Sequence, residues 1–121
     1  MTSIFIVDDD ENLHRAYQSL FSMKGFTVIA NAYDGAQAVT IFNQLNPRPD
    51  ILIMDYRMPI KDGVSATREI TQIDPTSKII FLSADETARD LALQAGAISF
   101  LIKPVRFTYL IKTIEDILHD H

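Results

Sequence analysis

Short apolar runs alternate along the chain with longer segments in which apolar residues recur at helical spacing. The short runs are rich in Ile, Val, Phe and Leu, as are the buried strands of parallel sheets. Five segments fit this description, at residues 3–7, 26–30, 51–54, 78–82 and 98–102. We therefore predict five strands separated by helices.

The intervening segments show the pattern of amphipathic helices. The first places its apolar residues at i, i+3, i+4, i+7 and i+8 from Leu13, which is one face of a helix, and Gly25 follows as a stop signal. Further helices are predicted around residues 38–45, 62–73, 88–95 and 110–118. The order is (βα)5, in which helices cover both faces of an open, doubly wound parallel sheet. We predict an α/β fold of this kind, as one domain spanning residues 1–121.

Composition narrows the classes of function. A chain of 121 residues can bury a core without disulfides, and it contains no cysteine for a disulfide, a thiolate metal site or a nucleophile. The formal charge of −5, from 16 acidic and 11 basic side chains, has the wrong sign for a surface that follows a phosphate backbone. No apolar stretch reaches the length of a membrane span. We expect a cytoplasmic protein that binds neither nucleic acid nor membrane directly.

Charged and hydroxyl side chains follow four of the predicted strands. Because the carboxyl ends of parallel strands meet at one edge of the sheet, these side chains are expected to lie together. Carboxylates about 4 Å apart repel by roughly 4 kcal/mol at an effective dielectric of 20, so such a cluster needs either shared protons or a cation. Mg²⁺ prefers oxygen ligands, and a lysine with a hydroxyl completes a phosphoryl-transfer site. The residues are Asp8, Asp9 and Asp10 after the first strand, Asp55 after the third, Ser83 after the fourth and Lys103 after the fifth.

Each of these residues also has a purely structural interpretation. Asp10 fits a helix N-cap, Ser83 fits a turn, and Lys103 fits an exposed loop. Their joint occurrence at four strand ends favours the chemical interpretation over chance.

At these positions the sequence resembles the receiver domains of two-component response regulators, over essentially its whole length. The resemblance implies the flavodoxin-like strand order 2-1-3-4-5. The matching motifs are IFIVDD at 4–9, ILIMDYRMP at 51–59 followed by Asp62-Gly63, IIFLSA at 79–84 and GAISFLIKP at 96–104.

The resemblance implies a role for each acidic residue. Asp55 would be the nucleophile that takes a phosphoryl group from a phosphohistidine. Asp9, Asp55 and the backbone carbonyl of Arg57 would bind Mg²⁺, whereas Asp8 would act mainly through a metal-bound water. Asp10 falls outside this set.

The resemblance also assigns the phosphoryl-binding and switch residues. Lys103, the hydroxyl of Ser83 and the backbone N–H of Ala84 would hold the phosphoryl oxygens, and Pro104 would follow a cis peptide bond. Phe100 would be the aromatic residue that follows Ser83 when the domain switches. The alternative for Phe100 is an ordinary core phenylalanine.

Partners follow from the same resemblance. The phosphoryl donor would be a sensor histidine kinase or a histidine phosphotransfer protein. An effector would bind the face formed by the fourth helix, fifth strand and fifth helix, and the protein would be a switch with slow autodephosphorylation rather than a turnover enzyme. Residues 107–109 replace the glutamate that winged-helix members of the family use in dimerisation, which favours a partner surface containing Tyr109.

Two further residues are expected to overhang the site. Arg57 lies two positions after Asp55, and Asp85 lies two positions after Ser83. We predict that these opposite charges pair across the phosphoryl group and hinder the water that would hydrolyse it.

Two other functions remain open. A haloacid-dehalogenase-like phosphatase would use the Asp8-x-Asp10 motif with Asp8 as nucleophile, but Asn12 and the short chain argue against it. A receiver-like adaptor would bind partners without phosphorylation, but such proteins usually lack one of the chemical residues. The three histidines, His14, His119 and His121, are scattered, and none is predicted to be catalytic.

Overall fold

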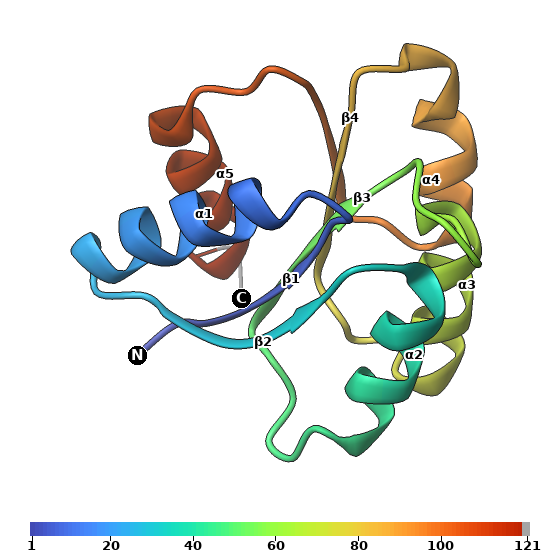
Figure 1. The fold of residues 1–121 in the computed structure, drawn as a ribbon, viewed down its shortest axis with the longest axis horizontal. Coiled ribbons are helices and arrows are strands. Elements are labelled where there is room, and N and C mark those ends of the chain that lie inside the picture. Colours follow the sequence, from blue (N-terminus) through green and yellow to red (C-terminus); the bar gives the residue numbers. More distant parts are fainter. Residues whose placement is uncertain (120–121) are drawn as a thin grey trace.

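The computed structural model describes residues 1–119, which form a five-stranded parallel sheet with helices on both faces (Figure 1). The strand order β2-β1-β3-β4-β5 confirms the predicted fold. The strands are β1 (Ser3–Val7), β2 (Thr27–Ala32), β3 (Ile51–Asp55), β4 (Ile79–Ser83) and β5 (Ser99–Ile102). The helices are α1 (Glu11–Met23), α2 (Gly35–Gln44), α3 (Gly63–Ile73), α4 (Arg89–Ala95) and α5 (Phe107–His119), with a short 3-10 turn, η1 (Glu86–Ala88).

The end of β2 differs from the sequence prediction, which stopped this strand at residue 30. β2 continues because Asn31 and Ala32 pair with Ile6 and Val7 of β1. An edge strand is exposed on one side, so a polar residue such as Asn31 can lie within it and interrupt the apolar run. The longer strand brings Asn31 close to the residues that follow β1.

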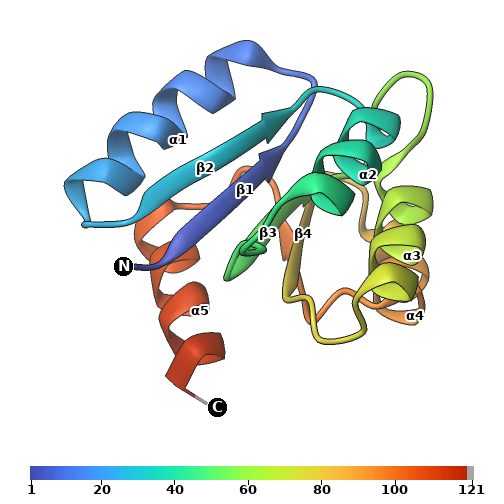
Figure 2. The same cartoon turned by 90° about the horizontal axis from the view of Figure 1, so that it is seen from below.

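Two hydrophobic cores fill the space on the two faces of the sheet. Helices α1 and α5 cover one face, and α2, α3 and α4 cover the other (Figure 2). Successive residues of β1 alternate between these cores, with Ile4 and Ile6 on the first face and Phe5 and Val7 on the second. Burial on both faces explains why the central strands read as continuous apolar runs. None of the described helices is both long and apolar enough to cross a membrane.

A glycine sets the approach of α3 to the end of β3. A Cβ atom at Gly63 would lie 1.8 Å from the carbonyl oxygen of Asp55, so only glycine fits there. The Gly63 N–H donates to the carbonyl of Tyr56 at 2.8 Å. This contact closes the loop after β3 and fixes the backbone of Asp55.

Candidate functional site

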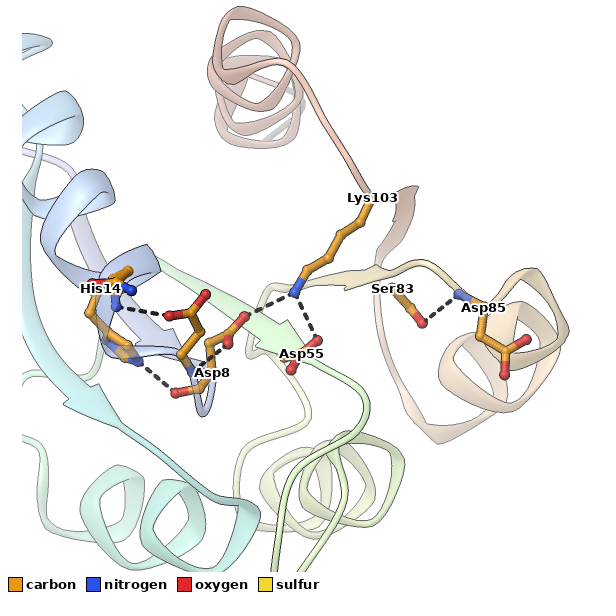
Figure 3. A network of polar contacts seen from close by, with 8 residues as sticks. Asp8, His14, Asp55, Ser83, Asp85 and Lys103 are labelled. Carbon is orange, nitrogen blue, oxygen red and sulfur yellow. Dashed lines mark hydrogen bonds and ion pairs between the residues drawn. The ribbon is translucent and has the colours of Figure 1, made fainter.

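The side chains predicted from the strand ends meet at the carboxyl edge of the sheet (Figure 3). Asp55 ends β3, Ser83 ends β4 and Lys103 directly follows β5. A surface cleft opens between them, lined by Asp55, Arg57, Ser83, Ala84, Asp85 and Lys103. The parallel topology therefore brings together residues that are up to 48 positions apart in the sequence.

Three carboxylates form a cluster beside this cleft. One oxygen each of Asp8, Asp9 and Asp55 lies within 4.8 Å of the others. Asp8 is 3% exposed and Asp55 9% exposed, whereas Asp9 faces solvent. An all-oxygen set with one exposed ligand suits a hard divalent cation that keeps several waters. Asp10 is not part of it, because its carboxylate caps α1 by accepting the Asn12 N–H at 2.9 Å, as the structural interpretation predicted.

Lys103 joins the two buried carboxylates. Its Nζ donates to Asp8 Oδ2 and to Asp55 Oδ1, both at 3.0 Å. Asp8 lies 95 positions earlier in the sequence, so this contact depends on the complete sheet. One ammonium group faces three carboxylates, and the cluster keeps an excess of negative charge.

The pKa shifts reflect this excess. Burial raises the pKa of Asp55, the nearby carboxylate of Asp8 raises it further, and Lys103 opposes both. Burial lowers the pKa of Lys103, but the carboxylates of Asp8 and Asp55 outweigh it, so the pKa lies above its usual value. Lys103 is therefore charged at neutral pH, while the raised pKa makes ionisation of Asp55 less favourable than that of a solvent-exposed aspartate.

Ser83 presents its hydroxyl to the cleft at the end of β4. The side chain is buried, and its Oγ accepts the backbone N–H of Asp85 at 3.0 Å. That bond uses a lone pair of the oxygen, so the hydroxyl proton stays free to donate to another acceptor. Ala84 lines the cleft beside it.

The predicted pair of Arg57 and Asp85 is present at the mouth of the cleft. Arg57 Nη2 lies 2.9 Å from Asp85 Oδ2. Hydrogen bonds from Thr87 to Asp85, together with the Arg57 guanidinium, hold the pKa of the Asp85 carboxyl below its usual value. The Arg57 side chain is 78% exposed, so this pair lies over the site without closing it.

Phe100 is a buried residue of β5. Its ring stacks on Phe81 of β4 with centroids 5.9 Å apart, and the Arg89 guanidinium lies 4.8 Å from its centroid. Phe100 is thus a core residue that also contacts the strand carrying Ser83. The Lys103–Pro104 peptide bond is cis, which confirms the prediction, and Asn46–Pro47 is a second cis bond that was not predicted.

Sequence reasoning missed the environment of His14. The ring is 4% exposed, with Nε2 2.7 Å from the carbonyl oxygen of Asp8 and Nδ1 2.7 Å from Oδ1 of Asn31. Its one sequence signal is its place in the first turn of the helix that follows the acidic residues. His119 is exposed at the end of α5, and His121 lies outside the described residues.

Comparison with known proteins identifies the family. The family model for the response regulator receiver domain matches residues 4–115. The chain is a response regulator receiver domain. This receiver domain is 36% identical to chemotaxis protein CheY of Bacillus subtilis (strain 168), over 96% of its own length and 97% of the relative.

Two solved structures resemble the receiver domain closely. One is the receiver domain of sensor histidine kinase PA1611 from Pseudomonas aeruginosa PAO1, with a magnesium ion coordinated in its active-site cleft; it is 31% identical, with a TM-score of 0.84 and 95% of each chain covered. The other is a CheX–CheY–BeF3–Mg complex from Borrelia burgdorferi, 28% identical with a TM-score of 0.90, covering 97% of this chain and 89% of that one. Receiver domains are the phosphoacceptors of two-component signalling, and this chain is a signalling switch of that kind. Family membership argues against the haloacid-dehalogenase alternative.

Proposed function

We propose that Asp55 accepts a phosphoryl group from the phosphohistidine of a sensor histidine kinase or a histidine phosphotransfer protein. A carboxylate oxygen of Asp55 forms the new O–P bond while the N–P bond of the phosphohistidine breaks, and the imidazole nitrogen keeps the electron pair. One observation carries this assignment: Asp55 is the acidic cluster residue that lines the cleft shared with Ser83 and Lys103. Both oxygens of Asp8 are instead engaged, by the Asp10 N–H and by Lys103.

We also propose Mg²⁺ as the cofactor. Asp9, Asp55 and the backbone carbonyl of Arg57 would bind it, and Asp8 would act through a bound water. The fit of three carboxylate oxygens within 4.8 Å supports this proposal, as does the magnesium in the related PA1611 receiver domain. When bound, Mg²⁺ supplies positive charge against the developing charge on the phosphoryl oxygens.

The remaining cleft residues hold the phosphoryl oxygens in this proposal. Lys103 offers a positive charge already aimed at Asp55, while Ser83 offers a hydroxyl proton and Ala84 a backbone N–H. A phosphoryl group adds roughly −1.5 to −2 charges, which draws the Ser83 hydroxyl toward Asp55. Phe100 then adjusts its packing against Phe81, and the change reaches the outer face of β5.

An effector would bind the face formed by α4, β5 and α5. Exposed apolar side chains gather on these elements and at their ends: Leu91, Leu93, Ile98, Ile102 and Tyr109. Residues 1–121 would act as one cytoplasmic receiver domain that dephosphorylates slowly, rather than as a turnover enzyme. The net charge of −5 supports effector contact through protein surfaces, without direct binding to nucleic acid or membrane.

Intact-mass spectrometry tests the proposal. The protein is incubated with Mg²⁺ and phosphoramidate, beside Asp55→Asn and a sample containing EDTA. A hydroxylamine-labile gain of roughly 80 Da in the wild type alone supports phosphorylation of Asp55. Phosphate release that is lost in Asp8→Asn but kept in Asp55→Asn would move the nucleophile to Asp8. No reaction in any sample would favour an adaptor that works without phosphorylation.

A further inference from the structure

His14 does not line the cleft, but its ring contacts the backbone of Asp8, a member of the acidic cluster. Figure 3 shows it on the side of Asp8 that faces away from Lys103. Its ring is held between the residue that follows β1 and Asn31 of β2, at 2.7 Å from each. The ring of Tyr33 packs against it, with centroids 4.3 Å apart and an interplanar angle of 38°. Contacts on three sides fix the orientation of this imidazole.

The direction of the hydrogen bond to Asp8 follows from chemistry. A backbone carbonyl can only accept, so Nε2 of His14 carries the proton and donates it to Asp8. On the other side of the ring, Nδ1 lies 2.7 Å from Oδ1 of Asn31. His14 and Asp8 are both buried, so an apolar residue at position 14 would leave the Asp8 carbonyl without its hydrogen-bond donor.

The carbonyl of Asp8 belongs to the planar peptide unit that joins Asp8 to Asp9. Holding this oxygen sets the rotation of the peptide plane, and with it the direction in which Asp9 leaves the turn. The Asp8 N–H donates to the carbonyl of Ala32 at 3.1 Å, and its Oδ1 accepts the Asp10 N–H at 2.9 Å. His14 holds the remaining polar atom of the Asp8 backbone.

We propose that His14 is a positioning residue for the metal site, holding the Asp8–Asp9 peptide so that both carboxylates face the same ion. The proposal rests on the proposed binding of Mg²⁺ by the acidic cluster. Outer partners that orient metal ligands typically change metal affinity about 10- to 100-fold when they are removed. His14 acts on the backbone between two cluster residues, so its removal disturbs both at once.

Isothermal titration calorimetry with MgCl2 tests this on the full chain. In His14→Gln the side-chain amide nitrogen can reach the place of Nε2, whereas in His14→Asn it reaches only as far as Nδ1. We expect His14→Leu and His14→Asn to weaken the Kd for Mg²⁺ about tenfold, and His14→Gln to restore most of the affinity. His119→Leu, at an exposed site in α5, is the matched control and should bind Mg²⁺ like the wild type.

Thermal unfolding in EDTA separates positioning from simple stabilisation. The proposal is overturned if the Kd for Mg²⁺ weakens in proportion to the loss of Tm across the variants and His14→Gln binds Mg²⁺ no more tightly than His14→Asn. It is equally overturned if His14→Leu binds Mg²⁺ as the wild type does. Should His14→Leu fail to fold, the Gln and Asn variants still decide between the outcomes. A wild-type protein that does not bind Mg²⁺ would contradict the proposed function itself.

Discussion

At the amino ends of β1 and β3, Asp50 accepts the backbone N–H of Ser3 at 2.9 Å and its hydroxyl at 3.3 Å. At the carboxyl ends of the same strands, Asp8, Asp9 and Asp55 form a cluster. Among the described residues, the ammonium group of Lys103 is the one cation that forms ion pairs with it. Asp50 is exposed and bonded to neutral donors, whereas two of the three clustered carboxylates are buried.

The two ends show how one residue type serves two purposes. Asp50 completes a set of hydrogen bonds with Ser3 that joins the starts of β1 and β3, and water hydrates the rest of its charge. Asp8 and Asp55 lack that solvation, and the single ammonium group of Lys103 compensates only part of the charge of the cluster. Burial and charge excess, more than the presence of aspartate, distinguish the reactive end of the sheet.

The largest effect is expected from Lys103→Met. This change leaves Asp8 and Asp55 side by side without their ammonium group, and we expect it to lower the free energy of unfolding by about 2 kcal/mol in EDTA. The cost stays below that of a fully buried pair because the lysine side chain is 28% exposed. Urea titrations with and without Mg²⁺ measure it, and Mg²⁺ should recover part of the loss. An unchanged free energy of unfolding in EDTA would show that repulsion between Asp8 and Asp55 does not destabilise the folded protein.

Asp55→Asn should shift stability in the opposite direction. It removes a carboxylate whose pKa is raised by burial and by Asp8, so we expect a gain of about 1 kcal/mol at neutral pH without metal. Because the folded pKa lies above the unfolded one, the ionised form destabilises the wild type once the pH exceeds the folded pKa. The gap in Tm between variant and wild type should therefore close as the pH falls below the ordinary range of aspartate. A gap independent of pH would refute this origin.

Asp50→Ala tests the other end of the sheet. Losing its bonds to Ser3 should cost about 0.5 kcal/mol, at the low end for hydrogen bonds because the site is exposed. Phosphorylation by phosphoramidate should proceed at the wild-type rate. A slower reaction in this variant would mean that the two ends are coupled through the sheet.

Arg57→Ala is expected to change a rate rather than the stability. An exposed ion pair contributes at most about 1 kcal/mol, so its loss should speed dephosphorylation by no more than about fivefold. The expected cause is easier access of water once the Arg57–Asp85 pair no longer overhangs the cleft. Decay of the phosphorylated mass after removal of phosphoramidate gives the rate, and an unchanged rate would rule out this shielding.

Most of the site could be predicted because parallel strands share one carboxyl edge. Asp55, Ser83 and Lys103 each follow an apolar run, so their meeting follows from topology alone. The environment of His14 could not be predicted in this way. One of its partners is a backbone carbonyl, and the other is Asn31, which lies in β2 beyond the residue at which the sequence predicted that strand to end. A backbone acceptor leaves no trace in sequence, and burial of a single polar residue in an amphipathic helix depends on the packing of its neighbours.

The 95 positions between Asp8 and Lys103 also set an order of events during synthesis. A growing chain displays its aspartates on the ribosome long before the lysine emerges, and β5 is the last strand to join the sheet. Until then Asp8 and Asp55 lack the ammonium group of Lys103, which bonds to both. The acidic cluster and Lys103 therefore meet only late in synthesis, and a chain truncated before β5 contains Asp55 without the lysine that faces it.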